Sequence, residues 1–196
     1  MPQRFDYSEQ QVIRQKLRQV GHGAFVRKGV AQTTIDELAA GAHIGKGSFY
    51  KFYASKHLLF FELLEQFQND LRAPLVSEET LQGQLNREHF EVLAKQMFET
   101  IASEPLIMIL GNEKEFGAIL SKLPPERLLE HQRKDQAFLD QLIGIWSVRK
   151  TKPERDQVAA QMTMLILICL QRGFFGDRLL PHAKRSAIKG LVDCFF

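Results

Sequence analysis

The sequence has few of the features that mark secreted, membrane or disulfide-bonded proteins. Its 196 residues include only two cysteines, Cys169 and Cys194, which are 25 positions apart and form no Cys-x-x-Cys pair. Residues 1–8 are polar, so we expect no secretory signal peptide. The most apolar window, residues 162–170, falls far short of the ~20 residues that span a bilayer. We therefore expect a cytoplasmic protein without membrane contact, whose thiols are reduced and buried.

Patterns for metal binding and catalysis are lacking as well. The six histidines lie scattered, without a His-x-x-x-His pair, and no Ser-His-Asp set or carboxylate pair stands at a catalytic spacing. The sequence therefore predicts no metal, no cofactor and no enzymatic activity. The histidines are His22, His43, His57, His89, His131 and His182.

Positive charge is concentrated towards the N-terminal end. Residues 1–56 hold nine Lys and Arg residues against four Asp and Glu residues, a local net charge of +5. Because the whole chain carries +3, the remaining residues carry −2. A basic end on a slightly acidic body suits a protein that meets phosphate groups at one end only.

Residues 33–56, TTIDELAAGAHIGKGSFYKFYASK, read as two short helices joined by a turn. Thr34 can cap the first helix, and Glu37 stands three residues later, as in a capping box. The second helix is expected to start near Gly45 and to run about two turns.

The second helix has two faces that favour different neighbours. Phe49, Phe52 and Tyr53 are expected to pack inward, while a lysine, a hydroxyl and a tyrosine side chain lie on the other face. A short helix of this kind, set across a first helix, has the layout of a helix-turn-helix, whose second helix enters the DNA major groove.

Two other interpretations of this stretch fit less well. A Walker A loop needs four residues between its first glycine and a Gly-Lys followed by Ser or Thr, whereas three residues separate Gly41 from Gly45 and no strand leads in. A helical hairpin with merely solvated lysines does not explain why the Thr-Thr pair, the Gly-Lys-Gly-Ser run and Tyr50 occur together.

At these residues the chain resembles the N-terminal DNA-binding domain of the TetR (tetracycline-repressor-like) family of bacterial transcriptional regulators. Two residues depart from the family pattern, because His43 stands where glycine is usual and Gly45 replaces the capping serine. Histidine tolerates positive φ better than most residues and glycine is an acceptable cap, so we expect the turn to form. The matching residues are Thr33-Thr34-Ile35, Leu38-Ala39, Ala42-His43-Ile44, Gly45-Lys46-Gly47-Ser48-Phe49-Tyr50 and Ser55-Lys56.

This layout predicts a set of DNA contacts. Lys46 and Ser48 are expected at base edges, with Lys46 near guanine O6 and N7, and the two glycines allow close backbone approach. The remaining members are expected at phosphates, although Tyr50 could equally contact a thymine methyl. The full set is Thr34, Gly45, Lys46, Gly47, Ser48, Tyr50, Lys51 and Lys56.

Helical patterns continue to the end of the chain, and no segment reads convincingly as a strand. The sequence therefore predicts an all-α protein of about nine helices, with a three-helix DNA-binding domain at residues 1–54 and a helical body at residues 55–196. The first helix is expected to open with a capping box formed by Ser8 and Gln11. The helices expected outside the helix-turn-helix cover residues 8–28, 56–73, 86–103, 105–123, 125–150, 153–175 and 181–196, with a loop at 76–84.

The resemblance implies an effector pocket within helices five to eight of the body. Apolar pockets with few polar anchors bind small organic ligands, but Met and aromatic residues at helical spacing more often belong to the core. Gln161, Glu113 and Gln171 are all open as the polar anchor. The candidate lining residues are Met97, Met108, Phe116, Trp146, Met164 and Ile168.

The last two helices carry apolar residues on more than one face, so one face can serve the core and a second implies a partner. The resemblance implies a homodimer in which these helices form a four-helix bundle, and a monomer with a thick core is the alternative. A two-fold dimer would set its recognition helices roughly 34–36 Å apart, which predicts a palindromic operator.

The function implied is a ligand-responsive transcriptional repressor that a small apolar effector releases from DNA. We expect the helix that begins at Lys56 to transmit the effect of ligand binding from the helical body to the DNA-binding domain, which we call the head. A helical interaction module without DNA binding is the alternative, and the choice between repressor and activator stays open.

Overall fold

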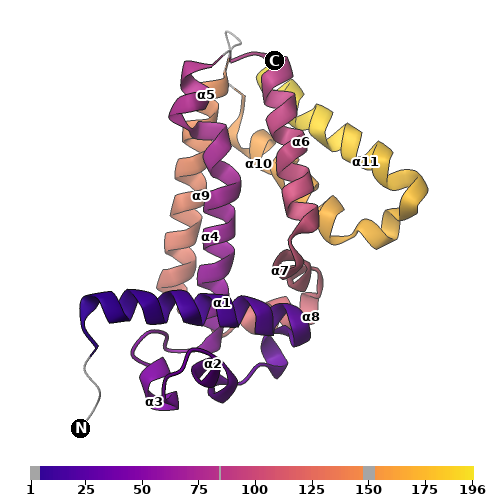
Figure 1. Cartoon of the computed structure of the whole chain (residues 1–196). Coiled ribbons are helices and arrows are strands. Elements are labelled where there is room, and N and C mark those ends of the chain that lie inside the picture. The colour runs from indigo at the N-terminus through magenta and orange to yellow at the C-terminus, as the bar shows by residue number, and fades with distance from the viewer. Residues whose placement is uncertain (1–4, 84, 148–152) are drawn as a thin grey trace. The chain divides into compact units, whose positions relative to one another are not determined.

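All regular elements that the structure describes are helices. The structure is a computed structural model that describes residues 5–83, 85–147 and 153–196. The predicted all-α class is confirmed within these residues. In chain order (Figure 1), the helices are α1 (Tyr7–Gln32), α2 (Ile35–Gly41), α3 (Lys46–Phe49), α4 (Lys56–Val76), α5 (Glu78–Gln82), α6 (Arg87–Ser103), α7 (Pro105–Met108), the 3-10 helix η1 (Ile109–Gly111), α8 (Glu113–Leu120), α9 (Pro125–Trp146), α10 (Arg155–Leu170) and α11 (Arg172–Phe195).

The chain folds into two compact units that are interleaved in sequence. The first unit comprises Met1–Phe67 and Met108–Pro124, and the second comprises Gln68–Ile107 and Pro125–Phe196. The first unit therefore contains α1 to α3, the beginning of α4, and α8. It extends past residue 54, where the sequence suggested a domain boundary, and it takes in a segment from the expected body.

Helix α1 is capped two residues earlier than expected. The Asp6 carboxylate accepts a hydrogen bond from the Glu9 N–H (2.8 Å), and the Glu9 carboxylate accepts one from the Asp6 N–H (2.9 Å). The prediction of a capping box at Ser8 and Gln11 was therefore wrong, because Asp is as good a cap as Ser and Glu completes the box. At the other end the helix breaks at Gly29, where φ is 78°.

Prolines were less effective helix breakers than the sequence suggested. Pro74 does not end α4, which runs on to Val76. Its carbonyl accepts a hydrogen bond from Thr80 Oγ1 (2.6 Å), so the end of α4 is tied to α5, which lies within the predicted loop at 76–84. A polar side chain that satisfies a free helix-end carbonyl stabilises such an ending.

The C-terminal break falls at Gly176, directly after the predicted helix at residues 153–175, whereas Pro181 does not open a helix as expected. Pro181 lies inside α11, and the chain changes direction at Gly176, where φ is 59°. A positive φ is readily available to glycine. The preceding helix ends at Leu170, earlier than predicted, and the segment 105–123 divides into α7, η1 and α8. The predicted end of the 125–150 helix lies outside the described residues.

Each unit has its own aromatic core. In the first unit, the Phe25 and Phe60 rings meet edge to face with centroids 5.6 Å apart. In the second unit, Phe90 lies 4.7 Å from Trp146 and 4.8 Å from Phe195, and all three side chains are fully buried. The Trp146 indole N–H donates to the Leu75 carbonyl (2.8 Å), which satisfies the polar atom of this large side chain.

The two cysteines are buried and unbridged, as expected. Burial raises the pKa of the Cys169 thiol to about 11, so this thiol is protonated at neutral pH.

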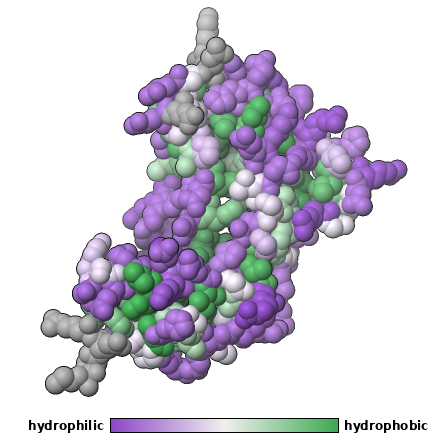
Figure 2. All heavy atoms as spheres, viewed as in Figure 1, coloured by the Kyte–Doolittle hydropathy of each residue, from purple (hydrophilic) through white to green (hydrophobic). Residues whose placement is uncertain are grey.

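Hydrophilic side chains cover most of the face of the molecule seen in Figure 2. In the part of the chain that the structure describes, no helix alone is long and apolar enough to cross a bilayer. Helices α10 and α11 reach that threshold only as a pair, and they are bent by 117° at the break between them.

Candidate nucleic-acid interface

Helix α2 begins at the predicted cap, but the Glu37 carboxylate pairs with Arg27 and Lys28 instead of completing the expected capping box. Thr34 Oγ1 accepts a hydrogen bond from the Glu37 N–H (3.2 Å), which satisfies one free donor of the first turn. Leu38 and Ala39 are buried. A Cβ on Gly41 would lie 2.6 Å from Val20 Cγ1, so this glycine allows α2 to approach α1 closely.

The turn after α2 is closed by a paired set of backbone hydrogen bonds. The Ile44 N–H donates to the Ala39 carbonyl and the His43 N–H donates to the Ala40 carbonyl, both at 3.0 Å. These are the two bonds of a Schellman motif, which needs a left-handed residue at its centre. His43 takes that role with a φ of 59°, so the expectation that histidine supports this turn is confirmed.

Helix α3 separates a buried face from an exposed one. Phe49 is fully buried and Tyr53 nearly so, whereas the adjacent Tyr50 is 51% exposed. The helix is one turn long, shorter than the two turns predicted, although hydrogen bonds to the Phe49 carbonyl from the Phe52 and Tyr53 N–H groups continue the turn. Phe49 and Tyr53 therefore anchor α3 and the turn that follows it in the core, and the opposite side of α3 is exposed.

The exposed side carries most of the predicted DNA-contacting residues. Gly45, Gly47 and Lys51 are exposed, as is Thr34 at the start of α2, and Ser48 is half-buried. A Cβ built on either glycine would meet no atom within 4 Å. The Lys51 ammonium group lies 5.3 Å from the centre of the Phe5 ring.

Lys46 already has a partner in the protein. Its ammonium group lies 2.8 Å from Asp36 Oδ2, with more than half of each side chain exposed. The hydrogen bond from this ammonium group to the Asp36 carboxylate raises the pKa of Lys46. An exposed pair of this kind contributes little stability and can exchange its partner.

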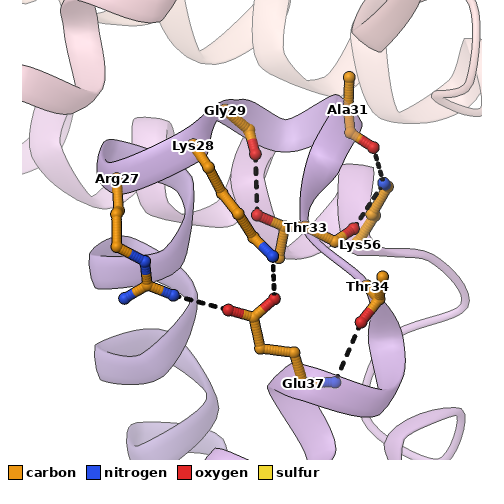
Figure 3. Close-up of polar contacts among 8 residues, drawn as sticks. All are labelled: Arg27, Lys28, Gly29, Ala31, Thr33, Thr34, Glu37 and Lys56. Atoms are coloured by element: carbon orange, nitrogen blue, oxygen red, sulfur yellow. Dashed lines mark hydrogen bonds and ion pairs between the residues drawn. The ribbon is translucent and has the colours of Figure 1, made fainter.

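Lys56 is placed differently from the other predicted contacts. Its ammonium group donates to the carbonyls of Ala31 (2.8 Å) and Thr33 (2.7 Å), as Figure 3 shows. Burial lowers the pKa of Lys56. In this structure Lys56 therefore ties the start of α4 to the segment between α1 and α2.

The same segment is held by four further polar side chains (Figure 3). Thr33 Oγ1 donates to the Gly29 carbonyl (2.8 Å). The Glu37 carboxylate accepts from Arg27 (2.6 Å) and pairs with Lys28 (2.5 Å). The hydrogen bond from Lys28 lowers the pKa of Glu37. These contacts fix the exit of α1 and the entrance of α2 together.

Two carboxylates whose roles the sequence did not indicate hold elements of the first unit together. Glu62 accepts a hydrogen bond from the Tyr53 hydroxyl (2.8 Å) and pairs with Arg14 (3.2 Å). Burial raises the pKa of Tyr53 above its ordinary range. The apolar pattern of α4 gave no signal for this role, because Glu62 reads as an ordinary solvated residue.

The second missed carboxylate is Glu115 of α8. Its Oε1 accepts hydrogen bonds from the Val30 N–H (2.7 Å) and the Ala31 N–H (3.3 Å). A Cβ on Gly29 would lie 2.7 Å from this oxygen. A residue 85 positions away in sequence thus satisfies the donors freed by the kink.

The predicted effector residues are divided between the two units. Met108 and Phe116 belong to the first unit, and the other four belong to the second. Met97, Trp146 and Ile168 are buried in the core of the second unit, whereas Met164 is 51% exposed. Three pockets of the described chain, with volumes of about 550, 330 and 700 Å³, are lined by other residues.

No group of three or more His, Cys, Asp or Glu side chains that could hold a metal ion occurs among the residues in 5–83, 85–147 and 153–196.

The α2–turn–α3 arrangement, with a buried aromatic face and an exposed basic face, defines a helix-turn-helix DNA-binding protein. Residues 19–63 match the model of the family described as "Bacterial regulatory proteins, tetR family". The N-terminal part of the chain is thus similar to the DNA-binding domain of TetR-family transcriptional regulators, as its helix-turn-helix residues suggested.

Known proteins resemble the chain in sequence over a third of its length and in fold over most of its length. The "HTH-type transcriptional repressor DhaR" of Mycobacterium sp. (strain GP1) is 31% identical over 65 residues, which span 33% of this chain and 33% of that repressor. A regulator structure from Mesorhizobium loti MAFF303099 has a TM-score of 0.67 and 17% identity, covering 95% of this chain and 96% of its own. The Thermus thermophilus FadR repressor, solved with lauroyl-CoA, has a TM-score of 0.62 and 19% identity, with 93% and 95% covered. At these identities the two structures show the fold alone.

Proposed function

We propose that the protein is a homodimeric repressor that binds a palindromic operator and is released by a small organic effector in the cytoplasm. The observation that carries this proposal is the division of α3, where Phe49 is fully buried and Tyr50 beside it is half exposed. This division supports insertion of the exposed side, with Lys46, into a major groove.

The DNA contacts can be tested with labelled DNA from upstream of the gene by fluorescence anisotropy. Lys46→Ala is expected to weaken binding about tenfold or more, since a base contact is worth ~1–3 kcal/mol. Tyr50→Phe should cause a smaller loss, because it removes one hydroxyl. Lys134→Ala serves as the control, since Lys134 is an exposed lysine of the second unit, paired with Glu130.

A helical interaction module without DNA binding is the second candidate. It predicts weak DNA binding that does not change with Lys46→Ala. Equal binding by the wild type, Lys46→Ala and Lys134→Ala would favour this candidate and contradict the repressor proposal.

The dimer is proposed to form through α10 and α11. Part of the apolar surface of these two helices, including Leu165 and Leu191, is buried within the single chain. Met164 and Leu167 of α10 remain about half exposed, one turn apart, and Phe174 at the start of α11 is 86% exposed. This apolar stripe supports contact with a second copy.

Light scattering during size-exclusion chromatography tests the dimer. Leu167→Glu places a charge in the stripe and is expected to shift the mass towards that of a single chain. Leu129→Glu is the control, because Leu129 of α9 is similarly exposed, at 52%, but lies outside the stripe. A dimer that survives Leu167→Glu and dissociates with Leu129→Glu would place the interface elsewhere.

The effector is proposed to enter the second unit near Trp146. The Trp146 ring lies 5.7 Å from His89, and His89 lines a pocket of about 700 Å³ together with Leu93 and Pro74. A pocket of this size suits a small organic molecule. Because Trp146 is the only tryptophan, its fluorescence reports occupancy, and native mass spectrometry can identify a copurified ligand.

Release of DNA requires that the effector bind the DNA-incompetent state more tightly than the competent one. We propose that α4 transmits this difference, with Lys56 at its start. A ligand that changes Trp146 fluorescence without changing DNA affinity would contradict this part of the proposal.

A further inference from the structure

A groove of about 550 Å³ lies between α6 and α11 in the second unit, where Figure 1 shows the two helices running side by side near the C-terminus. None of the residues predicted to contact DNA or the effector lines this groove. On α6 its wall extends from Arg87 to Glu99, a rise of about 18 Å along the helix.

The groove has an apolar floor. Ile188 and Val192 lie one turn apart on α11 and are only 4% and 1% exposed. Pro181 extends this apolar line towards the start of the helix. The methylene stems of the flanking Lys and Arg side chains add further apolar surface.

The walls of the groove are mainly cationic, with five basic and two acidic side chains. Two ion pairs link the helices across the groove. One joins Lys184 to Glu99, and the other joins Arg87 to Asp193. Of the two acidic side chains that line the groove, Glu99 links the helices and Glu91 pairs within its own helix. Lys189 shares Asp193 with Arg87.

Positive charge remains available between these two links. Arg185 is exposed and forms no ion pair with any residue in the described ranges. Among the described residues, Lys95 on the facing helix forms its ion pair with Glu91 of the same helix (2.6 Å). Arg185 stands one turn before Ile188, so it shares the face of α11 that forms the apolar floor.

We propose that this groove binds a single-chain amphiphile with an anionic head group. Its tail lies on Ile188 and Val192, and its head group meets Arg185 and Lys95. The lining matches such a ligand in both chemistry and size, because sites for small ligands combine apolar walls with a few polar anchors. A second copy of the chain is a poorer occupant, since a two-fold contact would bring two basic grooves together.

Calorimetric titration of the full-length protein with dodecanoate below its micelle concentration tests the proposal. We expect one site per chain, with binding weakened at least tenfold by Arg185→Glu. Arg178→Glu should leave the affinity unchanged, because Arg178 is an exposed arginine of the same helix outside the groove. Dodecyltrimethylammonium, with the same tail and the opposite charge, should not compete.

Two further measurements locate the site and identify the form of the ligand. A spin-labelled dodecanoate should broaden the methyl NMR signals of Ile188 and Val192, and leave the fluorescence of Trp146 unchanged. Phosphatidylglycerol vesicles should not sediment the protein, because a groove of this size takes single chains. The proposal fails if Arg185→Glu and Arg178→Glu bind dodecanoate equally, if the broadening maps to Trp146 alone, or if only vesicles bind. None of these measurements involves DNA, so their outcome is independent of the repressor proposal.

Discussion

The two units hold their helices together in different ways. In the first unit, side chains from distant positions bond to backbone groups around the kink in α1. Lys56 donates to the Ala31 and Thr33 carbonyls, and Glu115 accepts the Val30 and Ala31 N–H groups. In the second unit, an aromatic cluster around Trp146 forms the core. Both units have an aromatic core. In the first unit the bonds around the kink also fix the directions of the helix ends, whereas apolar packing tolerates changes in side-chain shape.

The largest expected effect separates anchoring from recognition within α3. Phe49→Ala removes a fully buried ring and should destabilise the head by about 3–5 kcal/mol. Tyr50→Ala, one residue later, should change stability by less than ~0.5 kcal/mol. Hydrogen exchange of the α2 and α3 amides measures both. Similar protection losses in the two variants would contradict the division of α3 into a buried and an exposed face.

A smaller effect is expected at the carboxylate that joins α8 to the kink. Glu115→Ala leaves the Val30 and Ala31 donors without their acceptor, which costs about 1–3 kcal/mol when such groups are buried. The exchange of these two amides should accelerate roughly tenfold or more. Glu115→Gln keeps a carbonyl acceptor and should restore most of the protection. An unchanged exchange rate in Glu115→Ala would show that this contact does not hold the kink in solution.

The turn between α2 and α3 offers a test with a stabilising outcome. His43→Gly relieves a positive φ in a residue with a Cβ and should stabilise the head by up to about 1 kcal/mol. The same change at Ala40, which lies within α2, should destabilise it by about 1 kcal/mol. Thermal unfolding of both variants compares them directly. Destabilisation by His43→Gly would mean that the imidazole makes a contact that outweighs the backbone strain.

The smallest effect concerns pH. Burial lowers the pKa of His57 below its ordinary value of 6.5, and the charges of Lys56 and Lys122 lower it further. The unfolded chain therefore binds this proton at a higher pH than the folded chain does. The contribution of His57 to stability is fully present above pH ~6.5 and declines as the pH falls below that value. His57→Gln should flatten the pH dependence of the melting temperature in this window. An unaltered pH profile would exclude His57 as its source.

The sequence could predict features that depend on local rules. Thr34 as a cap, His43 as the turn residue and Phe49 as an anchor all follow from spacing and backbone preference, and each is found. Proline was a less dependable signal. Pro74 and Pro181 lie inside helices, because nearby polar groups and a glycine kink set the helix ends instead.

Long-range roles could not be predicted. Nothing adjacent to Glu115 in sequence indicates that its carboxylate meets residues 30 and 31, and Lys56 reads as a surface cation until its carbonyl partners are known. The effector set stays a prediction for a related reason, since apolar residues at helical spacing do not reveal which unit they join. Met108 and Phe116 fall in one unit and Trp146 in the other.

The Lys46–Asp36 pair affects how Lys46 could contribute to the proposed recognition of DNA. In the protein without DNA, the charge of Lys46 is already partly neutralised by Asp36 at 2.8 Å, so the proposed contact with DNA would exchange one anionic partner for another. That exchange would leave Asp36 close to a polyanion, which would oppose indiscriminate attraction to any duplex. A favourable hydrogen bond to the correct base edge offsets that repulsion, whereas a phosphate alone offsets less of it. Asp36 beside Lys46 would thereby increase the selectivity of the protein for its operator and lower its overall affinity for DNA.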